Sequence, residues 1–476
     1  MALRRTKIVA TLGPASASEE VMEQLIRAGV GAARVNFSHG THAANGALID
    51  RIRAVASRLG KPVPIIQDIQ GPKIRVGVLP EGSVTLRAGD RVTMVAGETT
   101  TDPSVIPVTY EYLHQDAVPG ASILLDDGYL EVKVEAIEGR EVQAQVVTGG
   151  LLKSNKGVNL PGMKLSINAI TEKDIQDIKF GQKMGVEYVA ASFIRAAKDL
   201  KDVRSHLVNE EVRTKIIAKI ELREALENIE EIIRETDVIM LARGDLGVEL
   251  PPEEVPMVQK ELLQMCTLLG VPVITATQML ESMITNPRPT RAEASDVANA
   301  ILDGTAATML SAETASGKYP VEAVKTMARI AARAEEAVLA DPYATQRRRA
   351  MTLRTVQDSV AHATMVMAED LEAKAILVLT NTGNTAAMVS KYKPRVPILA
   401  MTPHERTYRQ LNLLWGVTPL LAPAAATQDA MHQAAIDAAL KAGHVQRGDA
   451  VVLCSGRVGQ TGGTNTVRAV VVGQGS

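Results

Sequence analysis

Four short apolar segments, each ending in a group of polar residues, constrain the fold of this chain more than any other feature. They read KIIAKIE (215–221), DVIMLARGD (237–245), VPVITATQ (271–278) and AATMLSAET (306–314). Their polar ends, marked by Glu221, Asp245, Thr277 and Glu313, follow one another at intervals of 24, 32 and 36 residues. Strands that are polar only at the C-terminal end are typical of a (β/α)₈ barrel, whose active sites lie on that rim. The pattern therefore predicts an enzyme.

The same pattern extends backwards along the chain. Further apolar stretches with polar ends, which bring the total to eight, lie at 6–14, 31–40, 63–71 and 186–195. Helical segments that each stop at a glycine separate some of them, at 18–28, 41–59 and 172–184. Thr171 with Asp174, and Thr290 with Glu293, match the capping box of helix starts. We therefore predict an α/β fold in which residues 1–70 and 166–340 form a catalytic (β/α)₈ TIM barrel.

The regular spacing breaks once, where about 115 residues separate Gly71 from Val186. Much of this stretch consists of short alternating runs rich in Val and Thr, separated by turn residues. Insertions into the loops after barrel strands lie on the catalytic rim and are placed to exclude water. We therefore predict that residues 71–165 form an inserted small β-barrel lid domain, the alternative being an insertion with no part in the chemistry.

Beyond the barrel, a charged segment at 341–355 leads into a second pattern of strands and helices. The strand-like runs are AILVLT, VPILAMT, VTPLLA, AVVLCSG and TVRAVVV, mostly separated by helix-like segments. This alternation predicts a C-terminal α/β domain, residues 350–476, with a mainly parallel sheet. Its loop TNTGNT (380–385) precedes a helical run, which suits either a phosphate site or a simple N-cap.

Composition excludes several classes of partner and location. Lys and Arg total 52 against 54 Asp and Glu, so the net charge of −2 gives no reason to expect a nucleic-acid partner. The chain has 2 cysteines, too few for a disulfide framework, and no apolar run reaches the roughly 20 residues of a membrane span. The N-terminus runs straight into a strand without an apolar signal core. We expect a cytoplasmic protein with no membrane partner.

The first candidate site uses oxygen ligands. Glu221 and Asp245 end neighbouring strands, and a pair of carboxylates suits Mg²⁺ or Mn²⁺, although two carboxylates alone are a weak metal signal. Lys219 lies two residues before Glu221 and shares its face, where a cation suits negative charge that grows on a reacting oxygen. The alternative is a structural ion pair between Lys219 and a rim carboxylate.

Other polar residues follow the same strand ends. Arg243 is able to bind a carboxylate or phosphate, and Thr277 can hydrogen-bond the substrate or cap a helix. The second strand ends in Arg34, Asn36 and Ser38 on one face, and the third ends in Asp68, a set that suits a monovalent cation or a buried hydrogen-bond cluster. Further cations near the barrel mouth are Lys73, Arg75 and Lys156.

Longer motifs add a resemblance to a known family. The chain resembles the pyruvate kinases from end to end, in motifs such as RRTKIVATLGPAS, ARVNFSHG, GPKIR, ILLDDG, KGVNLPG, AKIE, ARGDLGVE, ATQMLESM, RPTRAE and MLSAETASGKYP. The ATQMLESM and RPTRAE stretches are highly specific. The resemblance implies transfer of the phosphoryl group from phosphoenolpyruvate to ADP, giving ATP and enolpyruvate that is protonated to pyruvate, the last step of glycolysis.

The resemblance also implies roles at the rim. Glu221 and Asp245 would hold the Mg²⁺ or Mn²⁺ that bridges the substrate carboxylate and phosphate. Lys219 would stabilise the phosphoryl transition state and the enolate, and Arg34 would contact the phosphoryl group. Gly244 and Asp245 would bind the substrate through backbone groups.

A second set of implied roles concerns the proton and the nucleotide. Thr277 would bind the substrate and stand in the proton path, the alternative proton donor being a water chain. The nucleotide, ADP or ATP, would contact Arg75, Lys156, Asn36 and His39.

One position departs from the common family pattern. Many members need K⁺, held by the counterparts of Asn36, Ser38, Asp68 and the Ile69 carbonyl, with a glutamate at the position of Lys73. In this chain the Lys73 ammonium can supply that positive charge itself. We therefore expect an enzyme that depends on Mg²⁺ (or Mn²⁺) and does not require K⁺, with Lys73 as the internal cation.

The resemblance also bears on regulation and assembly. TNTGNT partly resembles the loop that binds a sugar bisphosphate in relatives, but Asn384 stands where many have arginine, and VGQTGGTNT (458–466) has no aromatic anchor. We expect an allosteric site for a phosphosugar or nucleotide in the C-terminal domain, and the resemblance implies a homotetramer.

Two rival functions stay open. Another barrel enzyme acting on phosphoenolpyruvate or pyruvate, such as a metal-dependent lyase, would share the carboxylate pair without needing the lid. A catalytically silent regulatory homologue is the second, and the presence of Lys219 and Thr277 argues against it.

Overall fold

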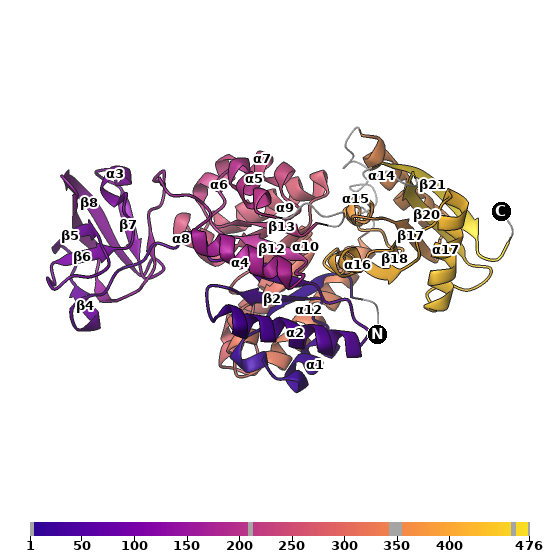
Figure 1. Ribbon diagram of the computed structural model, residues 1–476, viewed down its shortest axis with the longest axis horizontal. Coiled ribbons are helices and arrows are strands. Elements are labelled where there is room, and N and C mark those ends of the chain that lie inside the picture. Colours follow the sequence, from indigo (N-terminus) through magenta and orange to yellow (C-terminus); the bar gives the residue numbers. More distant parts are fainter. Residues whose placement is uncertain (1–3, 208–212, 342–354, 458–462, 475–476) are drawn as a thin grey trace.

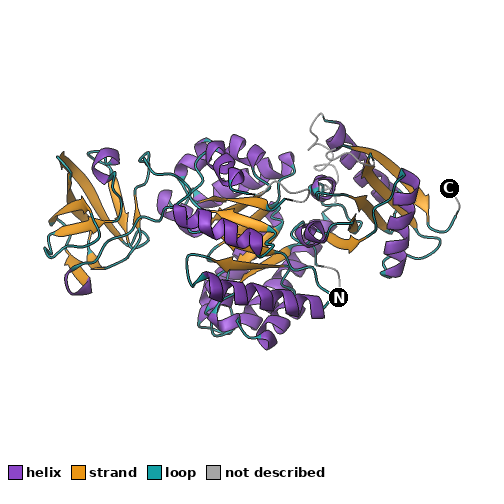
Figure 2. Ribbon diagram, viewed as in Figure 1, coloured by secondary structure: helices purple, strands orange, loops and turns teal. Residues whose placement is uncertain are grey.

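This computed structural model describes residues 4–207, 213–341, 355–457 and 463–474. The chain forms three groups of strands that lie in a row, with the barrel in the middle (Figure 1). The inserted segment lies on one side of the barrel and the C-terminal sheet on the other. Helices surround the barrel and flank the C-terminal sheet, whereas the insert consists mostly of strands (Figure 2).

Parallel strands close the barrel in the order β1-β16-β15-β14-β13-β12-β3-β2. They are β1 (Lys7–Thr11), β2 (Ala32–Asn36), β3 (Ile65–Asp68), β12 (Tyr188–Ala191), β13 (Lys215–Ile220), β14 (Val238–Ala242), β15 (Val273–Ala276) and β16 (Ala307–Leu310). Each predicted stretch contains one of them, so the predicted TIM barrel is confirmed. Apolar side chains such as Val9, Ile217 and Met240 fill its interior.

Helices cover the outside of the barrel. They are α1 (Glu19–Ala28), α2 (His42–Arg58), α4 (Glu172–Lys183), α5 (Ala197–Ser205), α6 (Arg223–Glu227), α7 (Ile229–Glu235), α8 (Arg243–Glu249), α9 (Val255–Leu269), α10 (Arg291–Asp303), α11 (Ala312–Ala315) and α12 (Pro320–Ala340), with short 3₁₀ turns η1 (Pro14–Ser16) and η3 (Glu281–Ile284). The capping boxes predicted at Thr171 and Thr290 both form. Gly29 ends α1 with φ +117°, the left-handed stop that the sequence predicted.

The insert is rich in strands, as predicted. Its elements are η2 (Pro80–Gly82), β4 (Ser83–Leu86), β5 (Arg91–Ala96), β6 (Val105–Val108), α3 (Leu113–Asp116), β7 (Ser122–Leu125), β8 (Leu130–Glu138), β9 (Glu141–Thr148), β10 (Gly150–Lys153) and β11 (Val158–Asn159). Six strands pair in the order β11-β7-β8-β9-β5-β6, and β10 pairs with β4. Val76 forms an isolated bridge with Val108 of β6, and Arg75 forms one with Gly157, which precedes β11. Because β6 and β11 are the two edge strands, these bridges close the inserted sheet into a small barrel without continuous strand pairing.

The C-terminal part contains a five-stranded sheet in the order β19-β18-β17-β20-β21. Its elements are α14 (Val356–Asp370), β17 (Ala375–Leu379), α15 (Asn384–Ser390), β18 (Ile398–Thr402), α16 (Glu405–Leu411), β19 (Val417–Leu421), α17 (Gln428–Lys441), β20 (Ala450–Gly456) and β21 (Thr464–Val471). Only the β20–β21 pair is antiparallel, so the prediction of a mainly parallel sheet is confirmed. Most of the charged segment at 341–355 lies outside the described residues.

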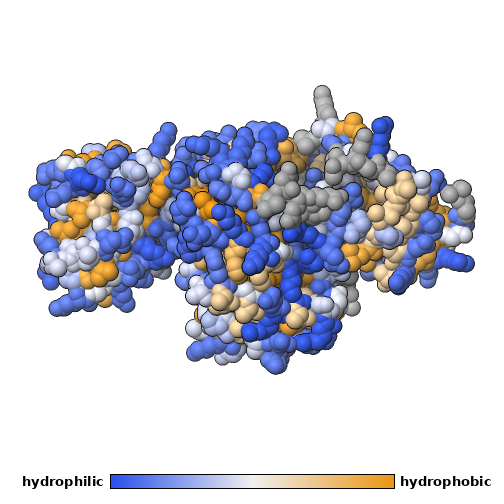
Figure 3. All heavy atoms as spheres, in the orientation of Figure 1, coloured by the Kyte–Doolittle hydropathy of each residue, from blue (hydrophilic) through white to orange (hydrophobic). Residues whose placement is uncertain are grey.

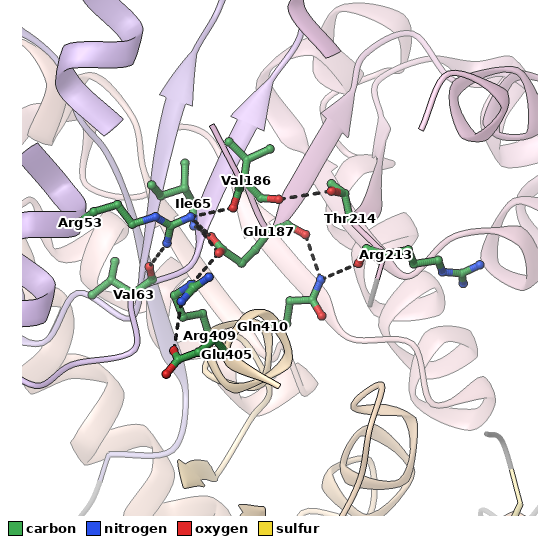
Figure 4. A network of polar contacts seen from close by, with 11 residues as sticks. Arg53, Val63, Ile65, Val186, Glu187, Arg213, Thr214, Glu405, Arg409 and Gln410 are labelled. Carbon is green, nitrogen blue, oxygen red and sulfur yellow. Dashed lines mark hydrogen bonds and ion pairs between the residues drawn. The ribbon is translucent and has the colours of Figure 1, made fainter. Parts of the chain in front are cut away.

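Polar contacts around Glu187, the residue before β12, join the C-terminal sheet to the barrel (Figure 4). Glu187 Oε1 accepts hydrogen bonds from Arg53 of α2 at 2.8 Å and from Arg409 of α16 at 2.7 Å. Its Oε2 accepts the Ile65 N–H at 2.7 Å, and its side chain is 0% exposed. Gln410 of α16 donates to the Glu187 carbonyl at 3.1 Å. These contacts lie at the N-terminal end of the barrel strands, opposite the predicted catalytic rim.

The face drawn in Figure 3 is predominantly hydrophilic, with hydrophobic residues in small scattered groups. Exposed large hydrophobic residues on the insert include Val78, Val118, Val147 and Leu151. Among the residues that the structure describes, no helix combines the length and apolar character needed to cross a membrane.

Candidate active site

The C-terminal rim of the barrel brings the predicted site residues together from separate strands. Some lie within β2 (Arg34, Asn36), β3 (Asp68) and β13 (Lys219), and the others follow β13, β14 and β15 (Glu221, Asp245, Thr277). Parallel strands end at the same rim, so side chains far apart in sequence meet there.

Positively and negatively charged side chains alternate along this rim. Arg34 Nε donates to Asp68 Oδ2 at 2.6 Å, and Lys219 Nζ lies 3.4 Å from Asp68 Oδ1 and 2.7 Å from Glu221 Oε1. Burial raises the pKa of Asp68, but Arg34 and Lys219 outweigh burial and hold that pKa below its usual value. Burial lowers the pKa of Lys219, but the carboxylates of Asp68 and Glu221 outweigh it and raise that pKa. The ammonium is therefore charged at neutral pH, and the ion pair considered from the sequence is present.

Glu221 and Asp245 are the carboxylates predicted to bind a metal. Burial, followed by the charge of Glu221, raises the pKa of Asp245 to about 6, while Lys219 and Lys73 act in the opposite direction. Glu221 Oε2 also accepts the Phe193 N–H at 2.8 Å. A divalent cation with oxygen ligands would offset the repulsion between the two carboxylates, so the residues fit Mg²⁺ or Mn²⁺. Among the described residues no three His, Cys, Asp or Glu side chains are placed to hold a metal ion together, so waters and substrate oxygens would complete the coordination around Glu221 and Asp245.

Thr277 and Gly244 meet at the neighbouring strand ends. The Thr277 hydroxyl accepts the Gly244 N–H at 2.7 Å and donates to the Ala276 carbonyl at 2.6 Å. Arg243, for which the sequence predicted a carboxylate or phosphate partner, binds a carboxylate of the chain itself, that of Asp296. Its Nη1 lies 2.6 Å from Asp296 Oδ1, and its Nη2 donates to the Thr277 carbonyl at 3.0 Å.

The oxygens predicted to hold a monovalent cation already accept hydrogen bonds from the chain. Asn36 Oδ1 accepts the Ser38 N–H at 3.0 Å, and the Ile69 carbonyl accepts the Ser192 hydroxyl at 3.0 Å. The two Asp68 oxygens face Arg34 and Lys219, as described above. These oxygens form a hydrogen-bonded cluster at the strand ends, and the cation site that the sequence also allowed stays a prediction.

Two of the cations predicted near the barrel mouth, Arg75 and Lys156, contact residues of the insert. Arg75 Nη1 donates to the Asn155 carbonyl at 2.9 Å, and Lys156 Nζ lies 2.8 Å from Asp126 Oδ1, which raises the pKa of Lys156. Both contacts are made within the insert, so neither Arg75 nor Lys156 pairs with the rim carboxylates in these contacts. Lys73 and His39 are exposed.

Two further residues complete the rim. Ser192, for which the sequence gave no role, accepts a hydrogen bond from Lys219 Nζ at 2.7 Å. Its only sequence signal was its place directly after the strand 188–191. Glu313 ends the fourth of the opening segments and is buried, with its oxygens accepting the N–H groups of Leu280 and Ser311 at 3.1 and 2.7 Å. It is part of the rim structure, as the sequence indicated.

A separate cavity of about 460 Å³ lies in the C-terminal part. The loop 380–385 lines it together with Thr402, His404, Arg457 and Thr464. Residues 458–462 of the predicted VGQTGGTNT stretch lie outside the described residues. The cavity has the hydroxyl, amide and cationic groups that bind phosphate esters.

Comparisons with known proteins cover nearly the whole chain. Residues 3–324 match the family model described as pyruvate kinase, barrel domain, and residues 358–470 match that of pyruvate kinase, alpha/beta domain. A pyruvate kinase of Geobacillus stearothermophilus is 47% identical over 98% of this chain and 80% of its own length. One from Staphylococcus aureus is 47% identical over 99% and 81%, and pyruvate kinase 2 of Synechocystis is 48% identical over 98% and 79%. The chain therefore belongs to the pyruvate kinase family.

Proposed function

We propose that this chain transfers the phosphoryl group of phosphoenolpyruvate to ADP, which gives pyruvate and ATP in the last step of glycolysis. The observation that carries the proposal is Lys219, a buried ammonium held between Asp68 and Glu221 with a raised pKa. Phosphoryl transfer needs positioning and charge neutralisation more than covalent chemistry from the protein. A fixed cation beside a pair of carboxylates supplies both.

Each rim residue has a role in this proposal. Arg34 contacts the phosphoryl group, and Lys219 stabilises the negative charge that develops on the transferred group and on the enolate. The substrate binds the backbone of Gly244 and Asp245. Glu221 and Asp245 hold Mg²⁺ or Mn²⁺, which when bound neutralises the carboxylate and phosphoryl oxygens of the substrate.

The second half of the reaction needs a proton on the enolate. Thr277 lies beside Gly244 and its hydroxyl can pass on a proton, either directly or through a water chain. The insert acts as a lid, and its closure over the rim brings Arg75 and Lys156 to the nucleotide phosphates beside Asn36 and His39.

A coupled assay for pyruvate, with phosphoenolpyruvate, ADP and Mg²⁺, tests this proposal. Turnover that needs ADP and yields ATP supports it. Pyruvate released without ADP would indicate a lyase, and binding without turnover would indicate a silent homologue.

We further propose that the enzyme needs no K⁺. The oxygens of Asn36, Asp68 and Ile69 already accept hydrogen bonds or ion pairs from the chain, which supports the proposal. Lys73 supplies the positive charge, and its effect on the pKa of Asp245 indicates that its charge reaches the rim. Activity is measured with K⁺ or tetramethylammonium at fixed Mg²⁺ and ionic strength. Equal rates are expected, with K⁺ dependence appearing in Lys73→Glu, and loss of wild-type activity without K⁺ would refute the proposal.

Regulation, assembly and domain limits are also proposals. The C-terminal cavity binds a phosphosugar or nucleotide effector, which titration against phosphoenolpyruvate saturation tests. We propose a homotetramer, testable by light scattering. Limited proteolysis tests the proposed domains, residues 1–70 with 166–340, 71–165 and 350–476.

A further inference from the structure

Arg243 lies at the catalytic rim but has no part in the mechanism proposed above. It is the first residue of α8, and its side chain is 11% exposed. Its guanidinium faces Asp296 Oδ1 at 2.6 Å, the Thr277 carbonyl at 3.0 Å and the Ala276 carbonyl at 3.4 Å. It also donates to Gln259 Oε1 at 3.4 Å and to Met279 Sδ at 2.8 Å. A buried arginine with all these partners in the protein is not free to bind substrate.

The two carbonyls belong to a strained stretch of backbone. Thr277 has φ +67° and Gln278 has φ +53°, both in the left-handed region. A β-branched residue adopts this conformation rarely, and it persists only where the surrounding structure holds it. Ala276 and Thr277 carry the carbonyls on either side of the Thr277 Cα. Hydrogen bonds from Arg243 therefore fix the peptide groups before and after this atom.

The same contacts set the direction of the Thr277 hydroxyl. The hydroxyl donates to the Ala276 carbonyl at 2.6 Å and accepts the Gly244 N–H at 2.7 Å. Arg243 and Gly244 are consecutive in the chain. The Arg243 guanidinium therefore holds the backbone of Thr277, and the neighbouring Gly244 N–H holds the Thr277 side chain.

We propose that Arg243 is a positioning residue, which acts through the carbonyls of Ala276 and Thr277 to aim the Thr277 hydroxyl at the substrate. Asp296 of α10 anchors the guanidinium. The inference rests on the proposed role of Thr277. Lysine cannot replace arginine here, because a single ammonium cannot present the planar set of donors that two carbonyls and a carboxylate require.

A double-mutant cycle tests the proposal. The kcat and the KM for phosphoenolpyruvate are measured for wild type, Arg243→Lys, Thr277→Val and the double variant. Arg243→Lys should lower kcat about 100-fold, as expected for a misplaced catalytic group, with KM changed less than about threefold. In the Thr277→Val background the same change should alter kcat less than about twofold. Exchange of the pyruvate methyl protons with solvent, which reports the proton step alone, should fall in parallel with kcat.

The outcomes separate this inference from the proposed function. Wild-type kcat in Thr277→Val would refute the role of Thr277 and with it the inference. An impaired Thr277→Val combined with additive losses in the double variant would refute the positioning role alone. If Arg243→Lys does not fold, Asp296→Asn replaces it in the cycle, and a kcat loss of about tenfold that disappears in the Thr277→Val background is expected. Lys260→Gln is the matched control, since Lys260 pairs with Asp303 between α9 and α10 without contact to residues 276–278, and it should retain wild-type kcat.

Discussion

Both ends of the barrel bury charged side chains, and the two groups differ in how their charges are balanced. At the N-terminal end, Arg53 and Arg409 meet the carboxylate of Glu187, and Arg409 also lies 3.2 Å from Glu405. Two partly exposed cations therefore face the buried carboxylate of Glu187 and the exposed carboxylate of Glu405, and the Ile65 N–H also donates to Glu187. The group needs nothing from outside the chain.

At the C-terminal rim the balance is incomplete. Arg34 and Lys219 lie among three carboxylates, those of Asp68, Glu221 and Asp245. Burial, followed by the charge of Glu221, raises the pKa of Asp245 to about 6, and the opposite effects of Lys219 and the exposed Lys73 do not offset this rise. The comparison indicates that a charged group with a structural role is neutralised by other residues of the chain. A charged group with a binding role keeps negative charge that a bound cation neutralises.

The largest expected effect comes from removing the rim cation. Lys219→Met should lower kcat about 1000-fold, because it removes a fixed charge that stabilises the transition state. The control is Lys7→Met, which removes another buried lysine at the opposite end of the barrel. Steady-state kinetics should show an inactive rim variant and an active Lys7 variant. Similar losses in both would contradict the assignment of catalysis to the rim.

The second prediction concerns the charged group around Glu187 at the N-terminal end of the barrel. Glu187→Gln leaves Arg53 and Arg409 without their buried carboxylate and should lower the free energy of unfolding by about 3 kcal/mol. Urea denaturation measures this loss, and the kcat of the folded variant should stay near that of wild type. Glu405→Gln, which removes a carboxylate that is 65% exposed, should cost less than about 1 kcal/mol. A variant of Glu187 that keeps its stability and loses turnover would place function at this end of the barrel.

The smallest predicted effect is a pH dependence. Lys7 Nζ donates to the Val417 carbonyl at 2.7 Å, and burial, with the charge of Arg4, lowers its pKa to about 7 although Glu335 acts in the opposite direction. The pKa of a lysine in the unfolded chain is about 10.4. Above pH 7 the unfolded chain therefore binds more protons at Lys7 than the folded protein does, so the contribution of Lys7 to the free energy of unfolding rises with pH. The difference in unfolding free energy between wild type and Lys7→Met should therefore change by about 1 kcal/mol per pH unit from pH 7 to 9. A constant difference would show that Lys7 is charged in the folded protein.

The sequence predicted the rim better than the junction, for a physical reason. Apolar strands with polar ends place Lys219 and Glu221 on one face, and the structure pairs them at 2.7 Å. The Glu187 group depends on how the C-terminal sheet docks, since Arg409 lies 222 residues away in sequence. No local pattern encodes such a contact.

The orientation of individual side chains was also beyond the sequence. Arg243 was expected to bind a carboxylate or phosphate, but only the structure shows that this carboxylate is Asp296 of the chain and that the Thr277 carbonyl is a further partner. Ser192 was missed because a serine after a strand is common, and its importance depends on the Lys219 ammonium 2.7 Å away.

Mn²⁺ binding measured by electron paramagnetic resonance tests the central claim most directly. Wild type should bind Mn²⁺ without substrate, because the rim carries unbalanced buried carboxylates. Asp245→Asn should weaken binding about 100-fold, whereas Glu187→Gln should leave it unchanged. Equal Mn²⁺ affinity in wild type and Asp245→Asn would contradict the account.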